Sequence, residues 1–285
     1  MAKRPKIAFL GNLAIDNNHY VLRSDSETHF GGACLYSAIS GGLFYPVYLL
    51  SKTGYDYDYS LYQHNPNNDF TYVTKIEGIE TNIFNNYIYT SDGSDRRVIG
   101  DVPDQFALSP SELPPIIYES ISHIHFTTNE PSRIVDIIEH LRKHTPHITI
   151  SIDTIEDFAN SKLTAYLYDI VDVAIIDDTN EELLRCNAPI KIIKHGKYGC
   201  TYSDRMKEIH IYSEIIDEVI DPIGAGDCLN GVLMTLLANG VSPEKALYVA
   251  NRVATEFVKD YGLFHLTRKK EFIDENKEYL GRTPK

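Results

Sequence analysis

The chain has 285 residues, of which 40 are acidic and 27 are basic, so its formal net charge is −13. A chain this acidic is not expected to have nucleic acid or an anionic membrane as its main partner, although a local site can still bind a small anion. The four cysteines lack metal-like spacing, and no apolar run is long enough for a signal peptide or a membrane span, which together predict a reduced, cytoplasmic protein.

Short apolar runs rich in β-branched residues recur along the chain, with helical patterns between them. The runs are nearly continuous in apolar character, which is typical of strands covered on both faces. Strands are expected at residues 6–11, 45–51, 123–127, 147–153, 171–177 and 190–196, and helices around 134–141, 229–237 and 246–257. This alternation predicts one α/β domain over residues 1–285, with a mostly parallel central sheet and helices on both faces.

Two polar segments interrupt this rhythm, at residues 17–30 and 81–100. Both alternate in part between apolar and polar residues, and the second carries a turn at residues 91–94. We expect them to form half-exposed strands outside the main sheet, as a small β lid. The charged tail from Arg268 predicts a final surface helix.

The sequence DPIGAGD, from Asp221 to Asp227, directly precedes an apolar pattern of helical period. A helix N-terminus carries unpaired N–H groups and partial positive charge, and glycine lets a ligand approach that backbone closely. The backbone of Gly224, Ala225 and Gly226 is therefore suited to hold a phosphate, with Asp227 as a base beside it. An ordinary glycine-rich turn with an acid at the helix start is the alternative.

DPIGAGD resembles the signature of the ribokinase-like (PfkB) family of carbohydrate and nucleoside kinases. The pair Gly31-Gly32 in FGGACLYSA resembles the family's second motif, which opens an N-terminal helix. Gly11 and Asp16 in FLGNLAID match the end of its first strand, and SPEKALYVANRVA is similar to its penultimate helix. The order and spacing agree over essentially the whole chain. The resemblance implies a ribokinase-like fold and a kinase that transfers the γ-phosphoryl group of ATP to an alcohol.

The resemblance also implies a role for each matching position. Asp227 would be the catalytic base, and the backbone of Gly224, Ala225 and Gly226 the anion hole. It assigns the substrate side to Asp16, Gly31, Gly32, Tyr36 and Arg97, and the nucleotide side to Lys194, Gly196, Gly199 and Asn251. ATP and Mg²⁺ are the implied cofactors, while a monovalent cation at the anion hole and a homodimer through the lid are left open.

The magnesium motif of the family, Asn-x-x-Glu, is altered in this chain. Its positions fall on Asp177 and Asn180, or on Glu181 after a slip of one residue. An Asp/Asn pair can still hold metal-bound waters, because Mg²⁺ prefers hard oxygen ligands and keeps much of its hydration. The alternative is a solvated loop after a strand. Ile223 is a second departure, since it stands where the family usually has a small hydroxyl residue.

Further departures lie on the substrate side and along the nucleotide strand. Tyr36 stands where many sugar kinases of the family have Asn, and the sequence YSA is similar to some archaeal members that resemble inositol kinases. Lys194 replaces a usual threonine. Arg96-Arg97 follows the lid turn, near an arginine that in the family often reaches the active site, and a surface pair is the alternative.

Polar residues that end strands are further candidates, because ligands gather at the carboxyl edge of open parallel sheets. Asp153 and Asn129 belong to this group. The leading hypothesis is an ATP-dependent kinase of a small sugar or inositol-like polyol. A nucleoside kinase of the same family, and a binding protein that has lost turnover, are the alternatives. A dinucleotide oxidoreductase is disfavoured, since GNLAID lacks the GxGxxG turn.

Overall fold

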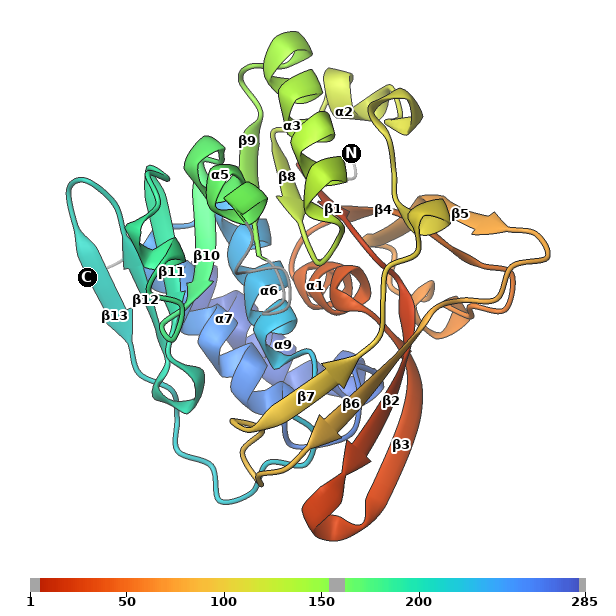
Figure 1. Cartoon of the computed structure of the whole chain (residues 1–285). Coiled ribbons are helices and arrows are strands. Elements are labelled where there is room, and N and C mark those ends of the chain that lie inside the picture. Colours follow the sequence, from red (N-terminus) through yellow and green to blue (C-terminus); the bar gives the residue numbers. More distant parts are fainter. Residues whose placement is uncertain (1–5, 154–161, 282–285) are drawn as a thin grey trace.

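A sheet of nine strands forms the centre of the computed structural model, which describes residues 6–153 and 162–281 (Figure 1). From edge to edge the strands are β13 (Glu208–Ile211), β12 (Cys200–Ser203), β11 (Ile190–Lys194), β10 (Val173–Asp177), β9 (Thr149–Ile152), β8 (His123–Phe126), β1 (Ile7–Leu10), β4 (Val47–Gly54) and β5 (Asn68–Ile76). All neighbours from β11 to β5 pair in parallel, whereas β12 and β13 are antiparallel. The predicted mostly parallel sheet is confirmed.

Helices cover both faces of this sheet, as the continuous apolar strands predict. They are α1 (Ala33–Gly42), α2 (Ile116–Glu119), α3 (Pro131–His144), α5 (Lys162–Ile170), α6 (Ala225–Ala238), α7 (Pro243–Phe257), α8 (Phe264–Arg268) and α9 (Lys270–Gly281). Alternate residues of β1 point to opposite cores: Phe9 joins the cluster that contains α1, α6 and α7, and Leu10 joins the one that contains α3 and α5 (Figure 1). Among the described residues, no helix has the length and apolar character to cross a membrane.

The lid is a separate sheet of four strands, in the order β3-β2-β6-β7. Its strands are β2 (Ala14–Tyr20), β3 (Asp25–Gly31), β6 (Ile83–Ile88) and β7 (Arg96–Ile99). Along β2, buried residues such as Asp16 and Asn18 alternate with partly exposed ones such as Asn17. One face of the lid therefore covers the carboxyl edge of the main sheet. The two lid segments predicted from the sequence are confirmed.

Three strands of the main sheet were missing from the prediction: β5, β12 and β13. All three lie at or next to an edge of the sheet. The β5 sequence NDFTYVTKI mixes polar and apolar residues, because an edge strand is not covered on every side. β12 and β13 are only four residues long and form an antiparallel pair, so their apolar content is too short to stand out.

Candidate active site

The N-terminus of α6 is built around Gly224, the residue that caps it. Gly224 has φ +88, a left-handed conformation that favours glycine. A Cβ at this position would lie 2.7 Å from the ring of Tyr36, so the turn also needs glycine for space. Ala225 and Gly226 follow in the first turn, where N–H groups point away from the helix. The N–H of Ala225 donates to the carbonyl of Pro222 at 3.3 Å, which leaves Gly226 as the more open donor of the predicted anion hole.

Asp227 is half-buried in the first turn of α6. None of the described groups donates a hydrogen bond to its carboxylate, whose neighbours act through charge. Burial, followed by the charge of Asp153, raises the pKa of Asp227 to about 7, although Lys194 and Arg96 oppose the shift. A carboxylate that titrates near neutral pH and keeps its oxygens unbonded is well suited to accept a proton.

Asp16 lies on the buried face of the lid, 4 % exposed, beside the N-terminus of α1. One carboxylate oxygen, Oδ2, accepts hydrogen bonds from the Tyr36 hydroxyl at 2.8 Å and from the Gly32 N–H at 3.1 Å. Burial raises the pKa of Asp16 to about 6, against the effect of these two bonds. A side chain on Gly31 would collide with both Asp16 and Tyr36. The structure therefore brings together four of the predicted substrate residues.

Lys194 ends β11 within a buried network of charges. Its ammonium lies 2.7 Å from Asp153 Oδ2 and 3.5 Å from Asp177 Oδ2, and its side chain is 13 % exposed. Asn230, on α6, donates to the same oxygen of Asp153 at 2.5 Å. Burial alone would lower the pKa of Lys194, but the nearby Asp153 and Asp177 raise it, so the ammonium stays charged. Strand ends β9, β10 and β11 thus meet the head of α6.

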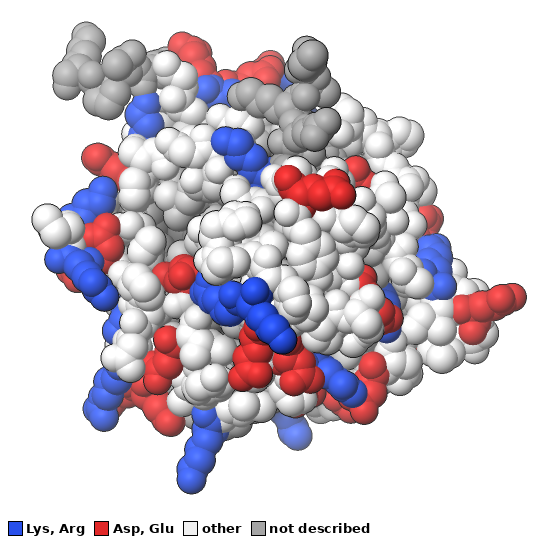
Figure 2. Space-filling view, turned by 90° about the horizontal axis from the view of Figure 1, so that it is seen from above, with Lys and Arg blue, Asp and Glu red and all other residues white. Residues whose placement is uncertain are grey.

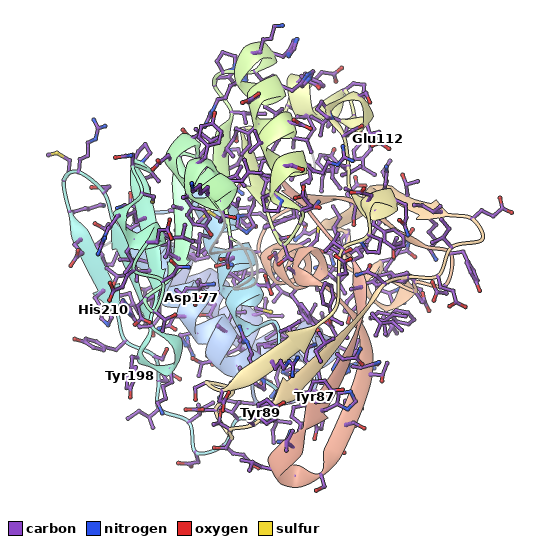
Figure 3. The ribbon with its side chains drawn as sticks, in the orientation of Figure 1. Tyr87, Tyr89, Glu112, Asp177, Tyr198 and His210 are labelled. Atoms are coloured by element: carbon purple, nitrogen blue, oxygen red, sulfur yellow. The ribbon has the colours of Figure 1, made fainter. Side chains whose placement is uncertain are left out.

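The predicted magnesium pair is brought only partly into this network. The carboxylate of Asp177 is 56 % exposed at the end of β10 (Figure 3), whereas Asn180 Oδ1 accepts a hydrogen bond from the Leu183 N–H. Glu181, the alternative ligand, pairs at 3.7 Å with Arg185 on the surface. Within residues 6–153 and 162–281, no three His, Cys, Asp or Glu side chains gather as metal ligands. Mg²⁺ often binds through one carboxylate and the substrate's phosphates, and Asp177 fits that arrangement.

The nucleotide-side glycines lie in the loop between β11 and β12. Gly196 (φ +54) is open to solvent. Gly199 (φ +107) packs against the end of β13, where a side chain would collide with the Ile211 carbonyl. Asn251 is buried in α7, and its amide bonds to Ser213 and to the Ile211 carbonyl. Asn251 therefore holds the chain after β13 in place, and the structure gives it a packing role.

Strand register separates the two lid arginines. Arg96 pairs with Ile88, which is buried, and Arg97 pairs with Tyr87, which stacks on His19 on the opposite face. Figure 3 labels Tyr87, which belongs to β6. Since paired residues share a face of a sheet, Arg96 lies on the inner face of the lid with Ile88, and Arg97 lies on the outer face. The charge of Arg96 also acts on Asp227. The register therefore favours Arg96 over the predicted Arg97 as the substrate-side arginine, because it puts Arg97 on the outer face of the lid.

One departure from the family pattern, Ile223, and one strand-end candidate, Asn129, have a structural role. Ile223 is buried against Tyr20 and Ile88 of the lid, so its apolar side chain serves packing between lid and anion hole. Asn129 is buried after β8, where its Oδ1 accepts from the Glu130 N–H at the start of α3. It therefore positions a helix start in this structure.

Sequence reasoning missed Asn12, which lies two residues after the end of β1. Its side chain is 2 % exposed, and within the described part of the chain neither its amide oxygen nor its nitrogen has a hydrogen-bond partner. Buried amides are normally satisfied, so such a group at the carboxyl edge of the sheet is a candidate ligand contact. The available signal was a polar residue immediately after the first apolar run.

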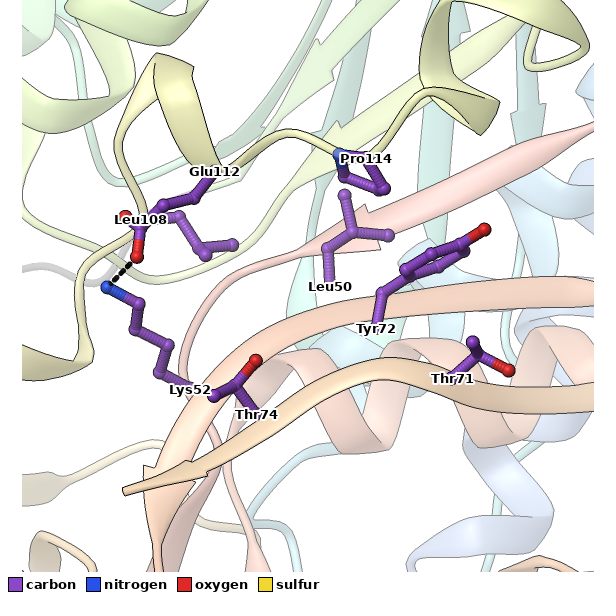
Figure 4. A pocket seen from close by; sticks show the side chains of 8 residues that line it. All are labelled: Leu50, Lys52, Thr71, Tyr72, Thr74, Leu108, Glu112 and Pro114. Atoms are coloured by element: carbon purple, nitrogen blue, oxygen red, sulfur yellow. Dashed lines mark ion pairs between the residues drawn. The ribbon is translucent and has the colours of Figure 1, made fainter. Parts of the chain in front are cut away.

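A hollow of about 300 Å³ lies on another part of the molecule, between β4, β5 and the segment before α2 (Figure 4). Its two charged residues, Lys52 and Glu112, pair with each other. None of the predicted site residues lines it.

On the face shown in Figure 2, Lys and Arg side chains are interspersed with Asp and Glu side chains.

Comparison with known proteins finds a family match over half of the chain. Residues 125–268, just over half of the chain, match the pfkB family carbohydrate kinases. Ribokinase from Bacillus subtilis (strain 168) is 41 % identical over 75 residues, so the alignment spans 26 % of this chain and only 25 % of that relative.

Solved structures show the same fold over nearly the whole chain. A Burkholderia thailandensis nucleoside kinase in complex with inosine has a TM-score of 0.79 and 15 % identity, covering 98 % of this chain and 100 % of its own. An E. coli protein assigned as a ribokinase II, in complex with ATP and Mg²⁺, has a TM-score of 0.71 and 17 % identity, covering 95 % and 100 %. The family match and this shared ribokinase-like fold place the chain in the pfkB family of carbohydrate kinases.

Proposed function

We propose that this protein transfers the γ-phosphoryl group of ATP to a hydroxyl of a small polyol, such as a sugar or an inositol. The observation that carries the proposal is the unbonded carboxylate of Asp227 beside the Gly224–Gly226 turn at the head of α6. A base and an anion hole in one helical turn are what phosphoryl transfer to an alcohol needs. The Bacillus subtilis ribokinase match and the ATP complex of the E. coli relative support it.

The chemical step follows from these positions. Asp227 takes the proton of the acceptor hydroxyl as its oxygen attacks the γ-phosphorus. The new O–P bond forms while the bond from that phosphorus to the β-phosphate oxygen breaks, and ADP leaves. The N–H groups of the first turn of α6 hold the equatorial oxygens of the moving phosphoryl group. Mg²⁺ bound with ATP would supply further positive charge to the phosphates, with Asp177 as its protein ligand.

The acceptor would be bound by the lid and the start of α1. Oδ2 of Asp16 is occupied by Tyr36 and Gly32, which fixes the carboxylate and directs its other oxygen to a substrate hydroxyl. Asn12 offers an unpaired amide nearby, at the end of β1. A polyol with neighbouring hydroxyls matches this set of acceptors and donors. The ribose of a nucleoside carries similar hydroxyls, so nucleosides belong in the same test.

The test is ADP production from ATP and Mg²⁺ with a panel of sugars, inositols and nucleosides. Asp227→Asn should lower kcat by about 10²- to 10⁴-fold, because the amide cannot accept the proton. Asp274→Asn, on the exposed face of α9, is the matched control and should leave kcat unchanged. Undiminished turnover by Asp227→Asn would remove this residue from the chemistry. An acceptor that binds to the wild type without any phosphate transfer would favour the binding-protein alternative.

A further inference from the structure

Lys194 is a lysine in an environment that rarely holds one. Its side chain is largely buried at the carboxyl end of β11, between Asp153 at 2.7 Å and Asp177 at 3.5 Å. A buried ion pair contributes little to stability after the two charges have lost their water, so packing alone does not account for the lysine. Its position in the fold indicates a use for the charge.

The ammonium lies beside the turn that we propose holds the phosphates. A Cβ built on Gly226 would be 3.5 Å from Lys194 Nζ, the nearest described atom apart from the glycine's own helical turn. Gly226 belongs to the first turn of α6, next to Asp227. A phosphate held by the N–H groups of this turn would therefore lie within reach of the ammonium. The helix and the lysine present positive charge to the same small volume.

The bonds of Lys194 leave room for such a ligand. An ammonium has three N–H donors, and Asp153 takes the shortest contact. The second contact, to Asp177, is longer, and that carboxylate is more than half exposed, so it can release the ammonium when a phosphate oxygen arrives and still be available to Mg²⁺. Asp153 cannot do the same easily, because it is buried and also bonded to Asn230. Asp153 thus holds the lysine, while the side of the ammonium toward Asp177 can exchange partners.

We propose that Lys194 is a phosphate-binding residue: its ammonium binds the terminal phosphates of the nucleotide at the head of α6, and Asp153 is the counter-ion that positions it. The inference deepens the proposed phosphotransfer and rests on it for the identity of the nucleotide. It also assigns Asp153 as a positioning residue that acts through Lys194. A threonine, which the family usually has here, could offer a hydrogen bond but no charge.

Calorimetric binding of ATP and of adenosine, without turnover, tests the proposal. Lys194→Met keeps much of the volume and removes the charge. We expect it to weaken ATP binding by about 10- to 100-fold, since a hydrogen bond between charged groups is lost, and to leave adenosine binding unchanged. Lys191→Met is the matched control on the same strand, because Lys191 donates to the Leu184 carbonyl. It should bind both compounds like the wild type.

A double variant separates phosphate binding from a merely structural role. Lys194→Met leaves Asp153 without its counter-ion, which by itself could disturb the site. Lys194→Met/Asp153→Asn removes both charges of the pair. If Lys194 only neutralises Asp153, the double variant recovers wild-type affinity for ATP, and the proposal is overturned. If Lys194 binds phosphate, the double variant still binds ATP weakly, although it binds adenosine like the wild type.

These measurements distinguish failure of the Lys194 proposal from failure of the proposed phosphotransfer reaction. A protein that never phosphorylates any acceptor, but whose ATP affinity depends on Lys194 in this way, would retain the phosphate site and lose the reaction. A protein that phosphorylates an acceptor, but binds ATP equally well with and without Lys194, would retain the reaction and lose this inference.

Discussion

The lid and the main sheet hold the site by different forces. The main sheet lies between two large apolar clusters that contain most of the buried side chains of the described residues. The lid has only small clusters, such as Ala14 with Phe84 and Val102. Besides the small apolar cluster around Ile223, polar contacts join the lid to the body: Asn18 donates to the buried Asp221 at 3.3 Å, and His29 lies 3.5 Å from the same carboxylate.

This difference suggests that the main sheet holds the base in place, whereas the lid moves to admit the substrate. Large apolar packing is close-fitting and resists movement, so the turn of Gly224 and the base Asp227 are held on a rigid support. Polar contacts between the lid and Asp221 can open and close with little apolar surface exposed, which suits an element that admits a substrate. The lid would then contribute groups that act only when it is closed.

Among changes to the lid, the largest effect is expected from Arg96. Arg96→Ala should lower kcat/KM by about 10- to 100-fold, because the closed lid would lose a cation that faces Asp227 and the phosphates. Arg97→Ala is the matched control from the same strand and should stay near the wild-type value, since its side chain lies on the outer face. Steady-state kinetics with ATP and the best acceptor measures both.

The pH dependence of kcat/KM provides a second test of Arg96 and Arg97. The charge of Arg96 lowers the pKa of Asp227, so its removal should shift the rising limb of the kcat/KM profile, near pH 7 in the wild type, to higher pH. Arg97→Ala should leave the limb in place. A larger loss from Arg97→Ala than from Arg96→Ala would contradict the register on which the division of labour depends.

Local signals predicted most of the main sheet and singled out the turn before α6. Strands buried on both faces are continuous apolar runs, and DPIGAGD contains the candidate base and the candidate anion hole within seven residues. What could not be predicted depends on pairing between distant segments. The choice between Arg96 and Arg97 needs the register with Ile88, and the packing of Ile223 needs the position of the lid. The antiparallel edge of β12 and β13 escaped because short edge strands have weak patterns.

A second, intermediate effect concerns the rigid side of the comparison. The pKa of Asp227 rises from 3.8 to about 7 on folding, so the native state loses stability as the pH rises between these values. Asp227→Asn removes this loss. The variant should therefore be more stable than the wild type at pH 8, by about 1–2 kcal/mol, a figure reduced because solvent reaches the half-buried carboxylate.

Urea unfolding of the unliganded protein at pH 5 and pH 8 measures this effect. The advantage of Asp227→Asn should be larger at pH 8 than at pH 5, because the carboxylate is mostly protonated at the lower pH. Asp274→Asn should show no such pH dependence. An advantage of equal size at both pH values would mean that the gain does not come from the charge of Asp227, and that the rigid support does not hold a destabilised base.

The smallest effect is expected at the tip of the lid. Asp92 forms an ion pair, at 3.0 Å, with Lys197 in the loop between β11 and β12. The neighbouring Gly93 packs directly on Pro222. The hydroxyl of Ser94 and the charge of Lys197 keep the pKa of Asp92 below its usual value. Exposed ion pairs contribute at most about 1 kcal/mol, so Lys197→Met should raise the KM for ATP by no more than about fivefold.

Salt and a double variant decide whether this pair acts as a lid latch. If it does, added NaCl should raise the wild-type KM toward that of Lys197→Met, since screening weakens an exposed pair. Asp92→Asn/Lys197→Met should then be no worse than either single change, because the pair is already broken. Additive losses would instead mean that Lys197 contacts the nucleotide directly. Lys207→Met, in the turn between β12 and β13, is the control for a general effect of charge. In that case the packing of Gly93 on Pro222, and not the ion pair, would hold the tip of the lid, so at this point an apolar contact would matter more to closure than a polar one.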